Sequence, residues 1–268
     1  MWRMPHLELT YPRPDIAVVT LNRPEKLNAL SHELVDDIHR ALDEIRANNE
    51  CRVVVLTGAG RGFCSGLDLS SLAPGAVADG TTFPRSAMRW QEHIADLTAR
   101  IYRLRQPVIA AVNGAAYGGG FGIALACDIR IASDSARFCT QFIKLGLGGC
   151  DIGVSYTLPR IIGAGPAFDL ILTARVVDAD EALRLGIVSR LSTNSSVVDD
   201  ALEIAETLCG YGKFGLESTK QVMWANIDAS SLEQALHVEN RSQILASTDG
   251  EAQKAAAAFV SRKSDNAS

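Results

Sequence analysis

Two glycine-rich turns carry the residues best suited to chemistry, because glycine lets a ligand approach the main chain closely. The first runs from Thr57 to Leu69 and the second from Asn113 to Gly122, where residues 118 to 120 are all glycine. Each follows a short apolar segment typical of a buried strand, and the second leads into a predicted helix. The free N–H groups and positive dipole of such a helix start stabilise a developing negative oxygen. Taken alone, each turn is also typical of tight packing.

Three other kinds of site are disfavoured by the motifs. The dinucleotide fingerprint beginning at Gly58 requires glycine at position 63, where the chain has Phe63, and the P-loop lysine is missing. A nucleophile elbow is absent, because the first turn reads G-x-x-S-G. His32 and His39 lie too far apart for the i, i+4 pair of a helical zinc site. We therefore disfavour dinucleotide, serine-hydrolase and zinc chemistry.

The elements that must position the turns alternate between strands and helices. Apolar, β-branched segments at 16–21, 53–56, 108–112 and 129–132 predict strands. Ser31 is a predicted N-cap for a helix with apolar residues at helical spacing, and further helices are expected at 85–104 and up to Ala126. Such alternation predicts an α/β fold with parallel strands and right-handed crossovers. Periodicity leaves a spiral of ββα turns and a doubly wound sheet both open.

The strand pattern ends near residue 197, where helical composition begins. Segments 197–209, 232–246 and 250–260 are expected to be helical, which gives a core at 1–196 and a helical region at 197–268. The amphipathic stripes of this region fit contact with its own subunit or with a neighbour. Residues 74–84 lack periodicity and are expected to form a mobile loop.

Composition limits the partners and the compartment. The chain has 268 residues, 47% of them hydrophobic, and a net charge of -5 without a basic run, so we expect no nucleic-acid partner. No apolar run reaches the roughly 20 residues of a membrane helix, and the first residues leave no room for a signal sequence. The six cysteines form no C-x-x-C pair and are expected to be reduced thiols. We expect a cytoplasmic protein without a membrane partner.

The order of motifs along the chain is more specific than any one motif. The segments are Arg23-Pro24, Asn28-Ala29-Leu30, Phe63-Cys64-Ser65-Gly66-Leu67-Asp68, Asn113-Gly114, Gly118-Gly119-Gly120, Ala126-Cys127-Asp128-Ile129-Arg130-Ile131-Ala132, Leu158-Pro159-Arg160-Ile161-Ile162-Gly163 and Gly186-Ile187-Val188. In this order they resemble the enoyl-CoA hydratase/isomerase (crotonase) family over residues 7 to 262.

The resemblance implies a fold, a substrate and an assembly. It implies a spiral of ββα turns, a C-terminal helical trimerisation region, and a homotrimer or homohexamer. It also implies an acyl-CoA thioester substrate, with coenzyme A as part of that substrate, and no metal or redox cofactor. In the family, the main-chain N–H groups at the positions of Leu67 and Gly119 form the oxyanion hole. The residues expected to bind substrate are Lys26, Asn28, Ala29, Cys64, Gly66, Leu67, Asp68, Leu69, Tyr117, Gly118, Gly119 and Phe142.

Two of these residues have alternative interpretations. Lys26 resembles family residues near the nucleotide end of coenzyme A, where its charge could pair with phosphate, but a solvated lysine fits equally. Asp68 is expected to accept hydrogen bonds and to order its loop. Cys64 and Cys150 flank the site, but no basic residue near them in sequence favours a thiolate.

The chain departs from the hydratase pattern at two positions. Hydratases of the family use two glutamates, and this chain has Gly122 and Phe142 at those places. Neither residue can move a proton, whereas addition of water needs one group to activate the water and another to protonate the α-carbon. The ordinary hydratase mechanism is therefore disfavoured.

Asp151 is the remaining candidate acid. It aligns with an aspartate that dienoyl-CoA isomerases of the family use for proton transfer, and also with the nucleophile of halobenzoyl-CoA dehalogenases. The dehalogenase alternative needs a tryptophan at the site, and the three tryptophans lie outside the pocket segments. A carboxylate beside Phe142 would be desolvated, which raises its pKa and suits it to carry a proton. A helix N-cap or loop-ordering role is the non-catalytic alternative.

Three classes of function follow. We favour an acyl-CoA hydratase/isomerase that stabilises a thioester enolate and uses Asp151 for isomerase-type proton transfer. A non-catalytic acyl-CoA-binding subunit is the alternative. A nicotinamide-dependent oxidoreductase is disfavoured by the broken glycine fingerprint.

Overall fold

The computed structural model describes residues 4–72, 85–192, 196–254 and 257, so the loop expected at 74–84 lies outside the described residues. The chain forms two compact units, Met1–Glu206 and Thr207–Ser268. Within the described ranges, no helix is both long and apolar enough to span a bilayer.

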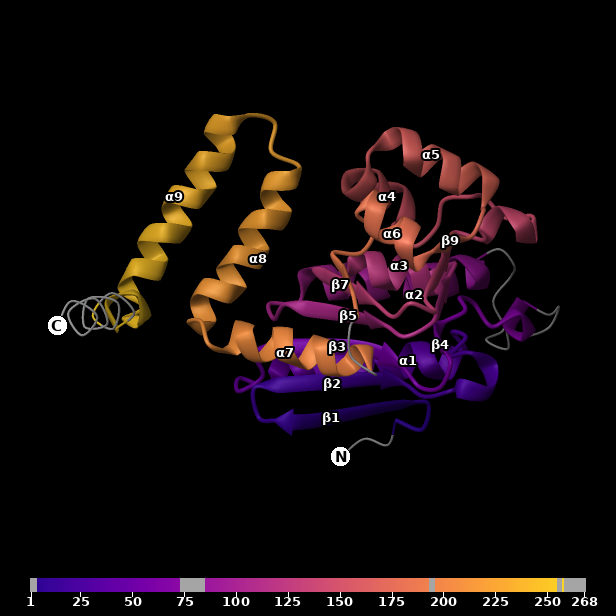
Figure 1. The fold of residues 1–268 in the computed structure, drawn as a ribbon, viewed down its shortest axis with the longest axis horizontal. Helices are drawn as coiled ribbons and strands as arrows, with labels where there is room; N and C mark the ends of the chain where they lie inside the picture. Colours follow the sequence, from indigo (N-terminus) through magenta and orange to yellow (C-terminus); the bar gives the residue numbers. More distant parts are fainter. Residues whose placement is uncertain (1–3, 73–84, 193–195, 255–256, 258–268) are drawn as a thin grey trace. The chain divides into compact units, whose positions relative to one another are not determined.

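The larger unit contains a sheet in which most neighbouring strands are parallel. Figure 1 shows its strands stacked from β1 through β2, β3 and β5 to β7. Among the described strands of this sheet, β1 and β2 pair in antiparallel fashion and the other neighbours pair in parallel. The strands, in sheet order, are β1 (Leu7–Arg13), β2 (Ile16–Leu21), β3 (Val53–Gly58), β5 (Val108–Val112), β7 (Ile129–Ala132) and β10 (Arg190–Leu191).

A second, smaller sheet explains how the chain forms a spiral. It contains β4 (Gly62–Cys64), β6 (Ala115–Tyr117), β8 (Arg137–Cys139) and β9 (Val177–Asp178). Strand β3 is followed by β4, β5 by β6, and β7 by β8, so each turn contributes one strand to each sheet before a helix. This arrangement confirms the spiral of ββα turns and excludes the doubly wound alternative. The short strands of the second sheet were not predicted.

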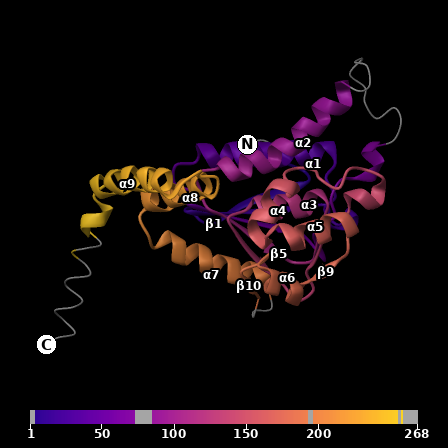
Figure 2. The same ribbon diagram turned by 90° about the horizontal axis from the view of Figure 1, so that it is seen from above.

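Helices α1 (His32–Ala47) and α2 (Arg85–Arg103) lie side by side along the first sheet in Figure 2. The Ser31 hydroxyl accepts the Leu34 N–H at 3.3 Å, which confirms the predicted N-cap of α1. Each helix turns an apolar stripe inward, as the helical period requires. The buried residues of these stripes include Leu34, Val35, Ile38, Leu42 and Ile45 of α1 and Ile94, Leu97 and Ile101 of α2.

The remaining helices of the larger unit are shorter than α1 and α2. Helix α3 (Gly119–Ala126) is buried along its whole length, as its apolar sequence requires. The other elements are η1 (Pro24–Lys26), η2 (Leu69–Leu72), η3 (Phe142–Leu145), α4 (Val154–Ile162), α5 (Ala164–Thr173) and α6 (Ala179–Leu185).

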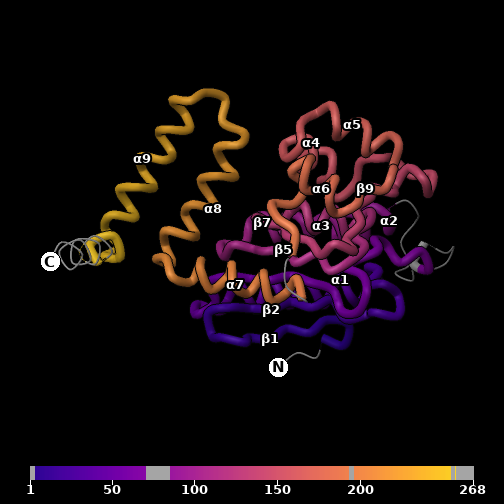
Figure 3. Tube along the Cα trace, in the orientation of Figure 1, coloured from indigo at the N-terminus to yellow at the C-terminus, as the bar shows by residue number. Residues whose placement is uncertain are grey.

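The described C-terminal residues are helical where helices were expected at 197–209 and 232–246, and part of the segment expected at 250–260 lies outside the described residues. Helix α7 (Val197–Cys209) ends in the second unit, where α8 (Lys213–Ile227) and α9 (Leu232–Thr248) form a hairpin (Figures 1 and 3). Helix α8 was not predicted, because its apolar residues form no clear stripe. Large apolar side chains of the hairpin stay exposed, including Met223, Ile227, Leu236, Ile244 and Leu245.

Arg130 on β7 fixes the C-terminal end of α3. Its guanidinium donates to the carbonyl oxygens of Cys127 and, at 3.5 Å, Leu125, and its Nε donates to the Ile187 carbonyl at 2.8 Å. The last carbonyl groups of a helix lack hydrogen-bond donors within the helix, and Arg130 supplies such donors here. This anchors the same helix whose N-terminus belongs to the second glycine-rich turn.

Arg130→Met should lower the free energy of unfolding by about 1–3 kcal/mol, because enclosed carbonyl groups lose their donors. Urea denaturation of the variant and the wild type measures the difference. The matched control is Arg190→Met on β10, an exposed position, which should stay near wild type. Equal stability of the two variants would contradict the anchoring role.

Candidate active site

The two glycine-rich turns meet at Gly66, which has a φ of +95°. A Cβ atom there would lie 2.8 Å from the Tyr117 carbonyl oxygen and 3.4 Å from the Gly119 nitrogen. Real Cβ atoms do not approach a backbone oxygen so closely, and the left-handed φ also favours glycine. Glycine at position 66 therefore allows residues 67 and 119 to come together.

Leu67 and Gly119 each present a main-chain N–H group for which the described part of the chain supplies no acceptor. In the bridge between Leu30 and Leu67, the Leu30 N–H donates to the Gly66 carbonyl at 2.8 Å, and the Asp68 N–H donates to the Leu30 carbonyl at 3.0 Å. This pattern leaves the Leu67 N–H unused, while Gly119 is the first residue of α3 and has no helical acceptor. Neither N–H donates to an acceptor in the part of the chain that the structure describes.

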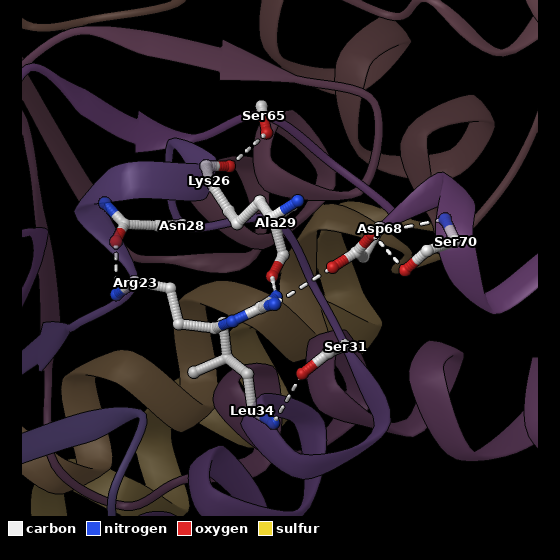
Figure 4. Close-up of polar contacts among 9 residues, drawn as sticks. All are labelled: Arg23, Lys26, Asn28, Ala29, Ser31, Leu34, Ser65, Asp68 and Ser70. Atoms are coloured by element: carbon white, nitrogen blue, oxygen red, sulfur yellow. Dashed lines mark hydrogen bonds and ion pairs between the residues drawn. The ribbon is translucent and has the colours of Figure 1, made fainter.

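An ion pair holds the first turn in place (Figure 4). Arg23 Nη2 lies 3.0 Å from Asp68 Oδ2, and Arg23 Nη1 donates to the Ala29 carbonyl at 2.5 Å. The Ser70 N–H and hydroxyl donate to Asp68 Oδ1. The Ser70 hydroxyl, and after it Arg23, hold the pKa of Asp68 below its ordinary value, against the effect of burial. Asp68 is thus an ionised acceptor within the loop.

Asn28 joins three backbone segments from a buried position. Its Nδ2 donates to the Ala59 and Gly62 carbonyls at 3.0 and 2.8 Å, and its Oδ1 accepts the Arg23 N–H at 2.8 Å. Figure 4 shows Asn28 beside Arg23. The side-chain amide of Asn28 thus makes its hydrogen bonds to main-chain groups. Asn28 therefore orders the turn and does not line the cavity.

A cavity of about 290 Å³ lies where the turns meet. Its rim is apolar and open, because Leu69, Leu145 and Leu147 are each at least 43% exposed. The lining residues are Ala29, Ser65, Gly66, Leu67, Asp68, Leu69, Gly118, Gly119, Gln141, Phe142, Leu145, Leu147 and Asp151. A polar floor with an apolar rim suits a ligand that has one polar group on an apolar chain.

The position of the first hydratase glutamate has no room for a side chain. A Cβ atom on Gly122 would lie 2.5 Å from Ile152 Cγ1. Ile152 is buried and has a φ of +35°, which is rare for a β-branched residue. The strained Ile152 therefore occupies the space beside Gly122. At the second position, the buried Phe142 ring faces the turn at Gly118.

Asp151 lies in the cavity wall and is half-buried. Its Oδ1 accepts the Ile152 N–H at 2.6 Å and the Gln91 side-chain amide at 2.5 Å. Burial raises the pKa of Asp151 above its ordinary value, and the two hydrogen bonds oppose that shift. Gly153, and not Asp151, is the N-cap of α4, so the N-cap alternative is wrong.

The structure brings most of the predicted site residues together, and four lie outside the cavity lining. Lys26 is exposed beside the first turn, Asn28 orders that turn, and Tyr117 presents its carbonyl to Gly66. Cys64 is fully buried, and burial raises the pKa of its thiol to about 12, so it is not a thiolate at neutral pH. The lining residues that sequence reasoning missed are Ser65, Gln141, Leu145 and Leu147.

The known proteins that are similar to this chain include hydratases and isomerases of CoA thioesters. The enoyl-CoA hydratase/isomerase family model matches residues 13–266. A probable enoyl-CoA hydratase of Mycobacterium tuberculosis is 44% identical over 234 residues, 87% of this chain and 82% of that protein. The 1,2-epoxyphenylacetyl-CoA isomerase of Escherichia coli is 33% identical over 258 residues, 96% of each chain.

Solved structures agree with these relatives. A probable enoyl-CoA hydratase/isomerase from Mycobacterium abscessus superposes with a TM-score of 0.83 at 43% identity, covering 90% of this chain and 89% of that chain. The relatives include a hydratase and an isomerase by name. The choice between these reactions therefore depends on the residues of the site.

Gly122→Ala should destabilise the fold by about 1–3 kcal/mol, because the new methyl group overlaps Ile152. Ile152→Gly removes the overlapping side chain, so the double variant should lose less stability than the sum of the two single losses. Denaturant unfolding of all four proteins measures this coupling. Strictly additive losses would contradict the overlap.

Proposed function

The chain belongs to the enoyl-CoA hydratase/isomerase family, and from this premise we propose that it moves the double bond of an enoyl-CoA thioester. The proposal depends most on one observation: Asp151 and the two unused N–H groups, those of Leu67 and Gly119, line one cavity. In this reaction the N–H groups hold the thioester oxygen and Asp151 carries the proton.

The two main-chain donors suit the charge that such a reaction develops. Removing a proton next to the thioester-conjugated system gives an enolate, whose negative charge gathers on the carbonyl oxygen. Donors already in place stabilise that oxygen without reorganising during the reaction. Because they are main-chain groups, the Leu67 side chain is free to contribute to packing instead.

Asp151 can complete a 1,3-shift alone. Its carboxylate takes a proton from the γ-carbon or α-carbon of the acyl chain, and the electron pair passes into the enolate. The protonated carboxyl group then returns the proton at the other carbon, which moves the double bond. The enzyme and substrate gain and lose no electrons overall, so this route needs no redox cofactor.

Hydration is disfavoured because neither of the two hydratase glutamate positions carries a group that can transfer a proton. Water addition requires a base for the water and an acid for the α-carbon. Gly122 and Phe142 occupy the two glutamate positions, and Ile152 fills the space beside Gly122.

We also propose the substrate and assembly that this family membership favours. The apolar rim formed by Leu69, Leu145 and Leu147 fits an acyl chain. A homotrimer or homohexamer in the cytoplasm would cover exposed apolar side chains such as Met223 and Ile244. The negative net charge does not favour nucleic acid as a further partner.

Asp151→Asn should lower turnover by a factor of about 10²–10⁴, because the amide cannot accept and return the proton. Isomerisation of 2-enoyl, 3-enoyl and dienoyl-CoA esters of several lengths measures the loss, and thioester binding should survive. Asp134→Asn, at an exposed turn, is the matched control. Equal turnover in wild type and Asp151→Asn would refute the assignment. If the wild type and both variants bind the thioesters tightly but turn none of them over, the binding-subunit alternative is favoured.

Gly119→Pro should reduce turnover by a factor of about 10²–10³, because proline has no N–H to donate to the enolate oxygen. Proline is tolerated at the first position of a helix, which Gly119 occupies in α3. Gly119→Ala is the matched control: it adds the same Cβ atom, which meets Leu30 at 2.9 Å, but keeps the N–H. If both variants lose the same activity, the lost hydrogen bond is not the cause.

A further inference from the structure

We propose that Gln91 of α2 is a positioning residue for Asp151: it holds one carboxylate oxygen so that the other is left to carry the proton. The proposal rests on the proposed function of Asp151 in proton transfer. Gln91 contacts Asp151 through its amide, and it is not among the residues that line the cavity.

The two carboxylate oxygens of Asp151 are unequal. Oδ1 accepts both the Gln91 Nε2–H and the Ile152 N–H, at 2.5 and 2.6 Å. Oδ2 accepts no hydrogen bond from any residue that the structure describes. Two donors converging on one oxygen fix the rotation of the carboxylate. They leave Oδ2 with its lone pairs available to a substrate proton.

Helix α2 lies along the turn that contains Asp151. Gln91, Ile94 and Thr98 lie on one face of the helix, because they are three and four residues apart. Ile94 is buried, and a Cβ atom on Gly153 would lie 3.6 Å from Thr98 Oγ1. The face that carries Gln91 therefore contacts Asp151 and lies beside Gly153.

Contacts with α1 keep the start of α2 in place. The Trp90 ring stacks on the His32 ring with centroids 3.5 Å apart, and His93 Nε2 lies 2.8 Å from Asp36 Oδ1. These residues flank Gln91 on both sides. Fixing a long, exposed side chain in one conformation costs conformational entropy. The anchored backbone of α2 lowers the number of positions that the Gln91 side chain can reach.

An amide is a suitable partner for a carboxylate that must gain and lose a proton. It donates to the ionised form without adding a positive charge, which would hold the carboxylate permanently ionised. It also cannot release its own proton at neutral pH, so Oδ1 stays a hydrogen-bond acceptor throughout the cycle. Gln91 therefore favours the ionised form moderately, against the burial that raises the Asp151 pKa.

No charged neighbour competes with this effect among the described residues. Burial raises the pKa of Asp151, and the hydrogen bonds from Ile152 and Gln91 oppose that shift. The titratable groups on the surrounding elements, none of which contributes to that shift, are Asp68 on the first turn, Lys144 on η3, Cys150 beside Asp151, and Arg89, Glu92 and His93 on α2.

Gln91→Met keeps the length of the side chain and removes the donor. Asp151 works as a base in its ionised form, so turnover falls as the pH drops through its pKa. Losing a donor to the carboxylate raises that pKa, so the acidic limb of the kcat profile should move up by about one pH unit. KM should change little, because Gln91 lies outside the cavity lining. Glu92→Met, exposed on the same helix, should leave the profile in place.

Gln91→Glu keeps the shape and replaces the donor by an acceptor. Two adjacent carboxylates share a proton, so the acidic limb should move up at least as far as in Gln91→Met. A purely structural role of Gln91 predicts instead that this near-isosteric variant keeps the wild-type profile, and that result would overturn the proposal.

Titration of the Asp151 carboxyl group separates this proposal from the proposed function. Carbon-13 NMR of aspartate-labelled full-length protein reads that pKa without turnover, with Asp151→Asn identifying the signal. A higher pKa in Gln91→Met supports the pairing, and an unchanged pKa overturns it even where Asp151→Asn is inactive. Full activity in Asp151→Asn would instead overturn the proposed function, whatever the titration gives.

Discussion

The close approach of two main-chain turns at Gly66 is the contact on which the rest of the site depends. Any side chain at this position would meet the Tyr117 carbonyl and push the segment that begins α3 away from Leu67. The N–H groups of Leu67 and Gly119, which line one cavity, would then lie farther apart. The spiral contributes this contact by placing β4 beside β6, and Arg23, Asn28 and Asp68 hold the first turn against it.

The conformation of Ile152 is a second constraint, because it affects both the glutamate position at Gly122 and the placement of Asp151. Ile152 fills the space beside Gly122 and adopts a left-handed conformation to do so. The same turn directs the preceding residue, Asp151, to the cavity wall, where the Ile152 N–H binds its carboxylate. Strained backbone of this kind persists where the surrounding structure holds it, and it is common at functional sites. The turn at Ile152 thus explains both why Gly122 has no room for a glutamate and why Asp151 lies in the cavity wall.

Sequence reasoning succeeded where a local pattern carries the information. The long strands and α1 follow from apolar periodicity, and the N-cap at Ser31 follows from residue type. The strands β4, β6 and β8 were missed because three residues are too few to show a period. Gln91 was missed for another reason: it bonds Asp151 across 60 positions of sequence, and no local pattern encodes such a contact. Leu145 and Leu147 become rim residues only through the fold of the segment around η3.

Mass spectrometry of the products formed in ¹⁸O-labelled water tests most directly whether the site isomerises or hydrates. Purified protein would be incubated with 2-enoyl-CoA and 3-enoyl-CoA esters, and the products separated. The proposed role of Asp151 as the proton carrier predicts interconversion of the two esters without a change in mass beyond hydrogen exchange. A hydroxyacyl-CoA product carrying ¹⁸O, formed at a rate equal to or above isomerisation, would contradict the account.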